Sequence, residues 1–273
     1  MNTWRLLYTP PSSGGWNMAV DESILVHIHR GEALPTLRLY AWNPPCLSLG
    51  HAQSFADVDM ERVKAHGWEV VRRLTGGRAI LHTGELTYSV TGSASEPILS
   101  GSILESYNRL AQALMFAVRE LGLPVELKEH SPAVEPATLN LNPVCFEVPS
   151  TYEITVNGKK LIGSAQARKK EGVLQHGSLP LTGDLTRICE ALVFKDEAAR
   201  ANAAQRLLAR ATTVESIIGV ETDWETAAQA FVKGFEAQLE IHFQRGELSR
   251  SESQRAEELV KEKYAHPSWT ERP

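Results

Sequence analysis

Apolar residues at helical spacing predict helices near both ends of the chain and one between them. They cover residues 14–30, 102–121 and 224–239. A Ser-x-x-Glu sequence, the pattern of a capping box, opens the second of these helices, and Gly122 follows its end. The same capping pattern opens a further helix over residues 249–264.

Alternating and β-branched runs predict strands in the first two thirds of the chain. These runs cover residues 36–42, 46–50, 86–90, 152–156, 159–165 and 174–179. Asn157-Gly158 separates two of them, and this dipeptide favours the type I′ turn of a hairpin. The pattern therefore predicts an α/β body up to about residue 182, followed by a smaller and mainly helical part.

One further stretch, Val70–Val90, is organised around a pair of glycines. A β-branched run and two arginines precede Gly76-Gly77, and a second apolar run, Ala79–Leu81, follows them. This order predicts a strand, a tight turn and a second strand, with cationic side chains beside exposed backbone N–H groups. Such a turn either holds a carbonyl, phosphate or carboxylate oxygen or is an ordinary hairpin with a basic rim.

Composition narrows the class of protein. The formal net charge of −5 argues against general nucleic-acid binding. The chain has no signal-peptide apolar region at its start and no stretch of roughly 20 apolar residues, so we expect no membrane association. The cysteines Cys46, Cys145 and Cys189 are widely spaced, which favours neither a disulfide framework nor a zinc site. We expect a reduced, cytoplasmic protein, with Cys46 packed in a strand.

Cys145 and Lys160 are the candidates for nucleophilic chemistry. Residues 129–144 contain three prolines and show no periodicity, which predicts a long surface loop leading to Cys145. A strand and a tight turn separate the cysteine from Lys160. An ammonium group beside the thiol would favour the reactive thiolate and could stabilise a developing oxyanion. From spacing alone, an inert core cysteine and a solvated lysine remain open.

Charged residues gather at two places. Asp21 and Glu22, near the start of the first helix, are interpreted as a solvated pair that suits the positive helix end. Cations cluster around the glycine pair and in a predicted turn over residues 168–170. The cluster consists of Arg72, Arg73, Arg78, Lys159, Arg168, Lys169 and Lys170. It would steer an acidic partner, although residues 168–170 are equally interpretable as a solvated turn.

Two motifs resemble the lipoate/octanoate transferase and ligase superfamily, which includes the biotin protein ligases. The first is Arg-Arg-x-Thr-Gly-Gly-Arg-Ala-x-x-His, from Arg72 to His82. The second runs from Pro143 through Cys145 and Gly-Lys-Lys-x-x-Gly-Ser-Ala-Gln to Leu-Gln-His-Gly-Ser. Both are similar to those of the cysteine-dependent octanoyltransferases of Gram-positive lipoate synthesis. The resemblance covers most of residues 14–180, and the closing segment from Lys263 to Trp269 also fits.

The resemblance implies an α/β (α+β) fold with a central mixed or antiparallel sheet flanked by helices. It implies a biotin/lipoate protein ligase-like catalytic domain over residues 30–243, with the helix over residues 14–30 packed on it. Residues 244–273 would form a small C-terminal helical extension. The implied activity moves an octanoyl group from octanoyl-acyl-carrier protein to a lysine of the glycine-cleavage H protein or of a lipoyl domain.

The resemblance also assigns roles to residues. Cys145 would form the acyl thioester, Lys160 would lower its pKa, and no ATP or metal would be required. The residues expected to bind the acyl substrate are Arg73, Thr75, Gly76, Gly77, Arg78, His82, Gly163, Ser164, Ala165, His176, Gly177 and Ser178. His82 and His176 are either hydrogen-bond donors in the wall of an acyl tunnel or structural histidines.

Three alternatives remain on the same fold. An ATP-dependent lipoate–protein ligase would use Lys160 on an adenylate, with Mg-ATP, and would not need Cys145. Arg78 stands where such ligases usually carry a third glycine, and Tyr152-Glu153 stands where they usually carry Asn-Asp. An amidotransferase that moves octanoyl from the H protein to other lipoyl domains would also use a cysteine. A catalytically dead acyl-binding module would bind the chain without forming an acyl-cysteine.

Overall fold

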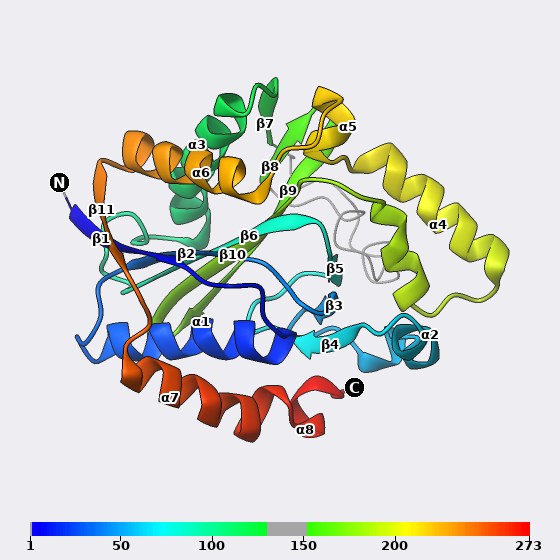
Figure 1. The fold of residues 1–273 in the computed structure, drawn as a ribbon, viewed down its shortest axis with the longest axis horizontal. Coiled ribbons are helices and arrows are strands. Elements are labelled where there is room, and N and C mark those ends of the chain that lie inside the picture. Colours follow the sequence, from blue (N-terminus) through cyan, green and yellow to red (C-terminus); the bar gives the residue numbers. More distant parts are fainter. Residues whose placement is uncertain (1, 130–151) are drawn as a thin grey trace.

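The computed structural model describes residues 2–129 and 152–273, and its centre is an eight-stranded mixed sheet in the order β11-β1-β2-β6-β10-β9-β8-β7 (Figure 1). Its strands are β1 Asn2–Tyr8, β2 Thr36–Tyr40, β6 Glu85–Gly92, β7 Val125–Glu129, β8 Tyr152–Val156, β9 Lys159–Lys169, β10 Gly172–Pro180 and β11 Ile241–Gly246. A second sheet has the order β4-β3-β5, with β3 Cys46–Leu49, β4 Glu69–Arg72 and β5 Ile80–His82.

Helices cover both faces of the large sheet (Figure 1). The α-helices are α1 Gly14–His29, α2 Met60–Ala65, α3 Ile103–Glu120, α4 Glu197–Arg210, α5 Val214–Ile218, α6 Trp224–Leu239, α7 Arg250–Leu259 and α8 Pro267–Thr270. Short 3-10 helices cover Phe55–Asp57 (η1) and Leu185–Ala191 (η4), and a π-helical turn covers Val260–Tyr264 (η5). Helices α3 and α6 pack together on one face, while α1 lies on the other face with α7 outside it. The predicted fold class is confirmed.

Local sequence signals place several of these elements. Ser102 and Glu105 form the predicted capping box of α3, and Gly122 adopts a φ of +82° just after that helix. Asn157 and Gly158 have φ values of 51° and 75°, as the type I′ turn between β8 and β9 requires. The predicted helices over residues 14–30, 224–239 and 249–264 are also present. No helix among the described residues is long and apolar enough to cross a membrane.

The predicted hairpin around the glycine pair is wrong. Strands β4 and β5 do not pair with each other, because β3 lies between them: Leu47 is in register with Val70 on one side and with Leu81 on the other. Residues 73–79 are therefore a loop that crosses the end of β3. Gly50, directly after β3, lets this loop approach, since a Cβ there would lie 1.9 Å from the carbonyl oxygen of Gly77.

The structure corrects or extends the prediction at three other places. Residues 168 and 169 continue β9 instead of forming a turn. The pattern does not predict strand β11, which runs across residue 243, where the predicted catalytic domain ends. The division into a catalytic domain and a C-terminal extension stays a prediction. The predicted loop over residues 129–144 lies outside the described residues, except for Glu129 at the end of β7.

Replacing Gly50 with alanine is expected to lower the free energy of unfolding by about 2 kcal/mol, because the new Cβ would collide with the Gly77 carbonyl. Urea unfolding at neutral pH measures this change. Gly15→Ala is the matched control, because a Cβ there meets only the Cβ of Tyr264, at 3.8 Å, and alanine suits a helix better than glycine. Equal stability of the two variants would contradict the close approach at Gly50.

Candidate functional site

A pocket lies where the two motifs that resemble the superfamily meet. Strands β9 and β10 contribute one side of it, and β5 and the 73–79 loop another. The remainder comes from α1, from β6, and from β2 with the residues that follow it. The predicted substrate-binding residues that line it are Arg73, Gly77, His82, Gly163, Ser164, Ala165, His176, Gly177 and Ser178. Gly177 is needed on β10, since a Cβ there would lie 2.6 Å from the Gly163 carbonyl oxygen. Two segments distant in sequence thus form one cavity.

Three predicted substrate-binding residues, Thr75, Gly76 and Arg78, are not among the lining residues. They hold the loop in shape instead. The Arg73 guanidinium donates hydrogen bonds to the carbonyl oxygens of Gly76 and Arg78, at 2.9 and 3.1 Å, and to the carbonyl oxygen of Ser48 at 2.7 Å. Arg73 therefore fixes the loop against β3 while it lines the pocket.

The sequence patterns missed part of the lining. Met18, Tyr40, Trp42, Ile80 and Thr87 also face the pocket. Tyr40 and Trp42 are two residues apart at the end of β2, so alternation along an extended chain could have placed them on one face. Met18 lies on α1, and the apolar spacing that predicts this helix does not distinguish a pocket-lining residue from a packed one.

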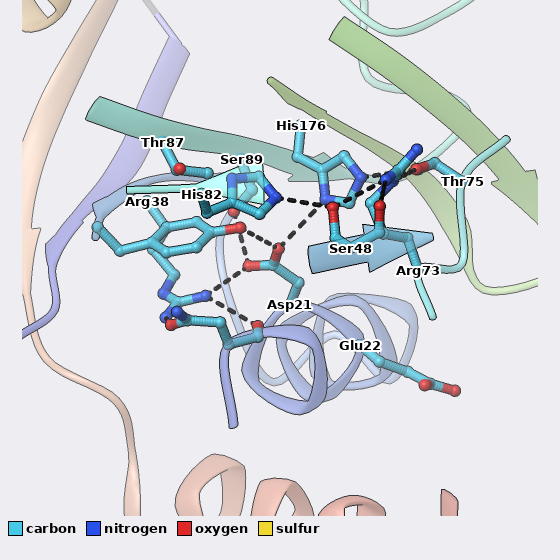
Figure 2. A network of polar contacts seen from close by, with 12 residues as sticks. Asp21, Glu22, Arg38, Ser48, Arg73, Thr75, His82, Thr87, Ser89 and His176 are labelled. Carbon is cyan, nitrogen blue, oxygen red and sulfur yellow. Dashed lines mark hydrogen bonds and ion pairs between the residues drawn. The ribbon is translucent and has the colours of Figure 1, made fainter. Parts of the chain in front are cut away.

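His176 connects the pocket wall to a buried carboxylate (Figure 2). Its Nε2 lies 2.6 Å from Thr75 Oγ1, and its Nδ1 lies 3.7 Å from Asp21 Oδ2. Asp21 is fully buried and accepts hydrogen bonds from Arg38 at 2.8 Å, Ser89 at 2.8 Å and Tyr40 at 3.1 Å. This arrangement holds the imidazole plane between the helix and the 73–79 loop.

His82 is held by a second set of contacts. Its Nε2 lies 2.7 Å from Ser48 Oγ, its Nδ1 faces Glu85, and its ring stacks on Trp42 with 3.9 Å between ring centroids. The Trp42 indole N–H donates to Thr87 Oγ1 at 2.8 Å. Both histidines therefore line the pocket and also contact other side chains of the protein. Each is compatible with the pocket-wall interpretation and with the structural one.

Burial and neighbouring charges shift the pKa values of these groups. Burial raises the pKa of Asp21, but the Arg38 guanidinium and the hydrogen bonds outweigh it and hold the pKa below its usual value. Burial also raises the pKa of Glu85, and His82 with Thr87 brings it below its usual value. Burial lowers the pKa of His176 despite the opposing effect of Asp21. At neutral pH these shifts give ionised carboxylates beside a neutral His176 imidazole.

The interpretation of Asp21 and Glu22 as a solvated pair is wrong. Asp21 forms a buried ion pair with Arg38, and Glu22 binds Lys263 at 2.8 Å and the Tyr264 hydroxyl at 2.6 Å. The reason is the position of α1, which lies between the large sheet and the C-terminal helices and so has little solvent-facing surface.

The predicted basic cluster lies only partly at the surface. Arg72 and Arg73 are buried, the Lys159 ammonium donates to the Leu208 carbonyl oxygen, and Arg168 donates to the Leu99 carbonyl oxygen and the Ser106 hydroxyl. Lys169 and Lys170 are exposed, and Arg78 is half-buried. These cations do not form one surface patch around the pocket, because most of them bind backbone carbonyls.

Arg72 links the C-terminal segment to the strands of the site. Its guanidinium donates to the carbonyl oxygens of Trp269, Thr270 and Arg272, at 2.9 to 3.1 Å for the shortest contact with each, and to that of Gln53. The Trp269 indole N–H returns a hydrogen bond to the Arg72 carbonyl oxygen at 2.9 Å. The last turn of the described chain is therefore fastened next to the 73–79 loop.

Cys145 lies outside the described residues, so the structure gives no geometry for it. Lys160 is buried, with 5% of its surface exposed, near the start of the strand that supplies Gly163 to Ala165. Cys46 and Cys189 are buried, and burial raises the pKa of the Cys46 thiol well above its usual value, as suits the predicted packing role. The described residues contain no group of three or more metal-binding side chains.

Comparison with known proteins identifies relatives of this chain. Residues 13–236 match the lipoyl protein ligase A/B catalytic domain. The octanoyltransferase LipM of Moorella thermoacetica is 42% identical, over 99% of this chain and 98% of its own length. The octanoyltransferase LipM of Kyrpidia tusciae is 39% identical over 100% of both chains. The structure of a bi-partite lipoate protein ligase system from Thermoplasma acidophilum shares the fold, with a TM-score of 0.80 at 24% identity, over 99% of this chain and 97% of that one.

Replacing Asp21 with asparagine is expected to lower the free energy of unfolding at neutral pH by about 3 kcal/mol, because Arg38 would stay buried without its counter-charge. The folded-state pKa of Asp21 is depressed, so its contribution is present above the unfolded pKa of about 4 and is lost as pH falls through the folded value. The difference between wild type and variant should therefore shrink below about pH 4.

Urea unfolding between neutral pH and about pH 3 measures this difference. Glu22→Gln is the control, since its carboxylate is partly exposed and its ion pair should contribute less than about 1 kcal/mol. A wild-type advantage over Asp21→Asn that grows on acidification would contradict the assignment.

Proposed function

Because this chain belongs to the lipoyl protein ligase A/B catalytic domain family and matches octanoyltransferases along its length, we propose that it transfers an octanoyl group through an acyl-cysteine on Cys145. The chain is an acyltransferase of protein lipoylation. The observation that carries the proposal is the pocket that both motifs line, since the surface it exposes is mostly apolar, as an acyl chain requires.

In the first step, the thiolate of Cys145 attacks the carbonyl carbon of an octanoyl thioester on acyl-carrier protein. The new C–S bond forms as the bond to the pantetheine sulfur breaks, and the pantetheine thiolate leaves and takes up a proton. Lys160, as an ammonium, would favour the Cys145 thiolate and stabilise the oxyanion of the tetrahedral intermediate. The position of Lys160 on β9, three residues before Gly163 of the pocket lining, supports this role.

In the second step, the amine of an acceptor lysine attacks the acyl-cysteine. An amide forms, the Cys145 thiolate leaves, and the amine releases its proton. The acceptor is a lipoyl-domain protein or the glycine-cleavage H protein. Conversion of a thioester into an amide is favourable, so the proposed reaction requires neither ATP nor a metal.

Incubation with octanoyl-acyl-carrier protein in the absence of ATP is expected to add one octanoyl group to the protein, as measured by intact mass. Cys145→Ala should abolish this adduct, because it removes the nucleophile. Cys189→Ala is the matched control, as it removes a buried cysteine outside the lined pocket and should leave the adduct intact. Failure to form an adduct, together with ATP-dependent transfer of lipoate, would make the chain a ligase instead.

Lys160→Met is expected to slow formation of the acyl-enzyme by about a hundredfold at neutral pH, because the thiolate would lose its cationic neighbour. The loss should be smaller near pH 9, where an ordinary cysteine thiol with a pKa of about 8.5 is ionised without help. Rapid-quench mass measurement across this pH range provides the test. A loss that is the same at every pH would remove Lys160 from thiolate activation.

A further inference from the structure

The residues that line the pocket range from exposed to buried, and we call the part with the exposed and half-buried ones its open end and the part at Met18, Tyr40, Trp42 and Thr87 its buried end. Among its lining residues, Gly77 is exposed and Ile80, Ser164 and Ala165 are half-buried. Met18, Tyr40, Trp42 and Thr87, by contrast, are each at most 6% exposed. A substrate attached to a carrier protein must enter from the open end, so the free end of its acyl chain reaches the buried residues.

Two aromatic side chains at the buried end are fixed in position. Trp42 stacks on His82 with an interplanar angle of 9°, and its indole N–H donates a hydrogen bond to Thr87. The Tyr40 hydroxyl donates a hydrogen bond to Asp21, and the Arg38 guanidinium lies 3.9 Å from the centre of the Tyr40 ring. With their polar atoms paired inside the protein, both rings present only apolar surface to a ligand.

Met18 completes this end from α1. It belongs to the same apolar cluster as Tyr40 and Trp42 and is 3% exposed. The described contacts fix both aromatic rings, whereas Met18 reaches the pocket through its apolar side chain alone.

We propose that Met18, with Tyr40 and Trp42 as rigid walls, sets the maximum length of the acyl chain that the pocket accepts. This inference rests on the proposed function, since it takes the ligand to be a fatty acyl group. The two rings bring no unpaired polar atom to the buried end, so they favour a chain that ends in a methyl group. Each further methylene would have to displace the methionine side chain, and close-packed interiors resist such displacement.

Met18→Ala should lengthen the accepted chain. The ratio of kcat/KM for decanoyl- over octanoyl-acyl-carrier protein is expected to rise about tenfold or more, since pocket space for a methylene typically changes discrimination by that factor. Met18→Phe should act in the opposite direction and favour hexanoyl over octanoyl substrate. Met115→Ala is the matched control: this methionine is equally buried, but it lies on α3 in the core on the other face of the sheet.

Calorimetric titration with free octanoate, decanoate and dodecanoate provides a second measurement that does not depend on Cys145. A shift of the binding optimum toward longer acids in Met18→Ala, but not in Met115→Ala, would support the inference even if no acyl-enzyme forms. An unchanged chain-length profile in both Met18 variants, with normal acyl-enzyme formation, would overturn the inference and leave the proposed function standing.

Discussion

One buried ion pair, between Asp21 and Arg38, determines how the candidate site is put together. A carboxylate in a protein interior is stable only when it is paired and hydrogen bonded. Asp21 must therefore face Arg38 and Tyr40 on β2 and Ser89 on β6, which fixes both the rotation and the height of α1 against the sheet. Met18 lies nearly one helical turn before Asp21, so the same ion pair places it at the buried end of the pocket.

Signals that act over a few residues made much of the fold predictable. The capping box at Ser102, the Asn157-Gly158 turn and the apolar stripes of the long helices each specify their element through contacts within one or two turns of chain. Most of the residues that the two resembling motifs singled out also line one pocket, and their role in substrate binding stays a prediction. The roles assigned to Cys145 and Lys160 stay predictions.

What the sequence did not reveal depends on partners far along the chain. Strand β3 lies between β4 and β5, and a pattern of alternation cannot specify which strand occupies that place. Asp21 resembles a helix-end carboxylate until Arg38 and His176 are known to face it. The arginines near the glycine pair resemble a surface cluster, because nothing local shows that their hydrogen-bond partners are the carbonyls of Ser48 or Trp269.

The attachment of Arg72 to the C-terminal segment affects the order in which the site can form during translation. The ribosome makes Arg72 long before Trp269, since 197 positions separate them. Until that late segment docks, the guanidinium has only the carbonyl partners that precede it in the chain, those of Gly50, His51 and Gln53. A nascent chain can therefore build most of its large sheet early, yet Arg72, next to the 73–79 loop, gains its remaining partners only after nearly all of the described sequence has been synthesised.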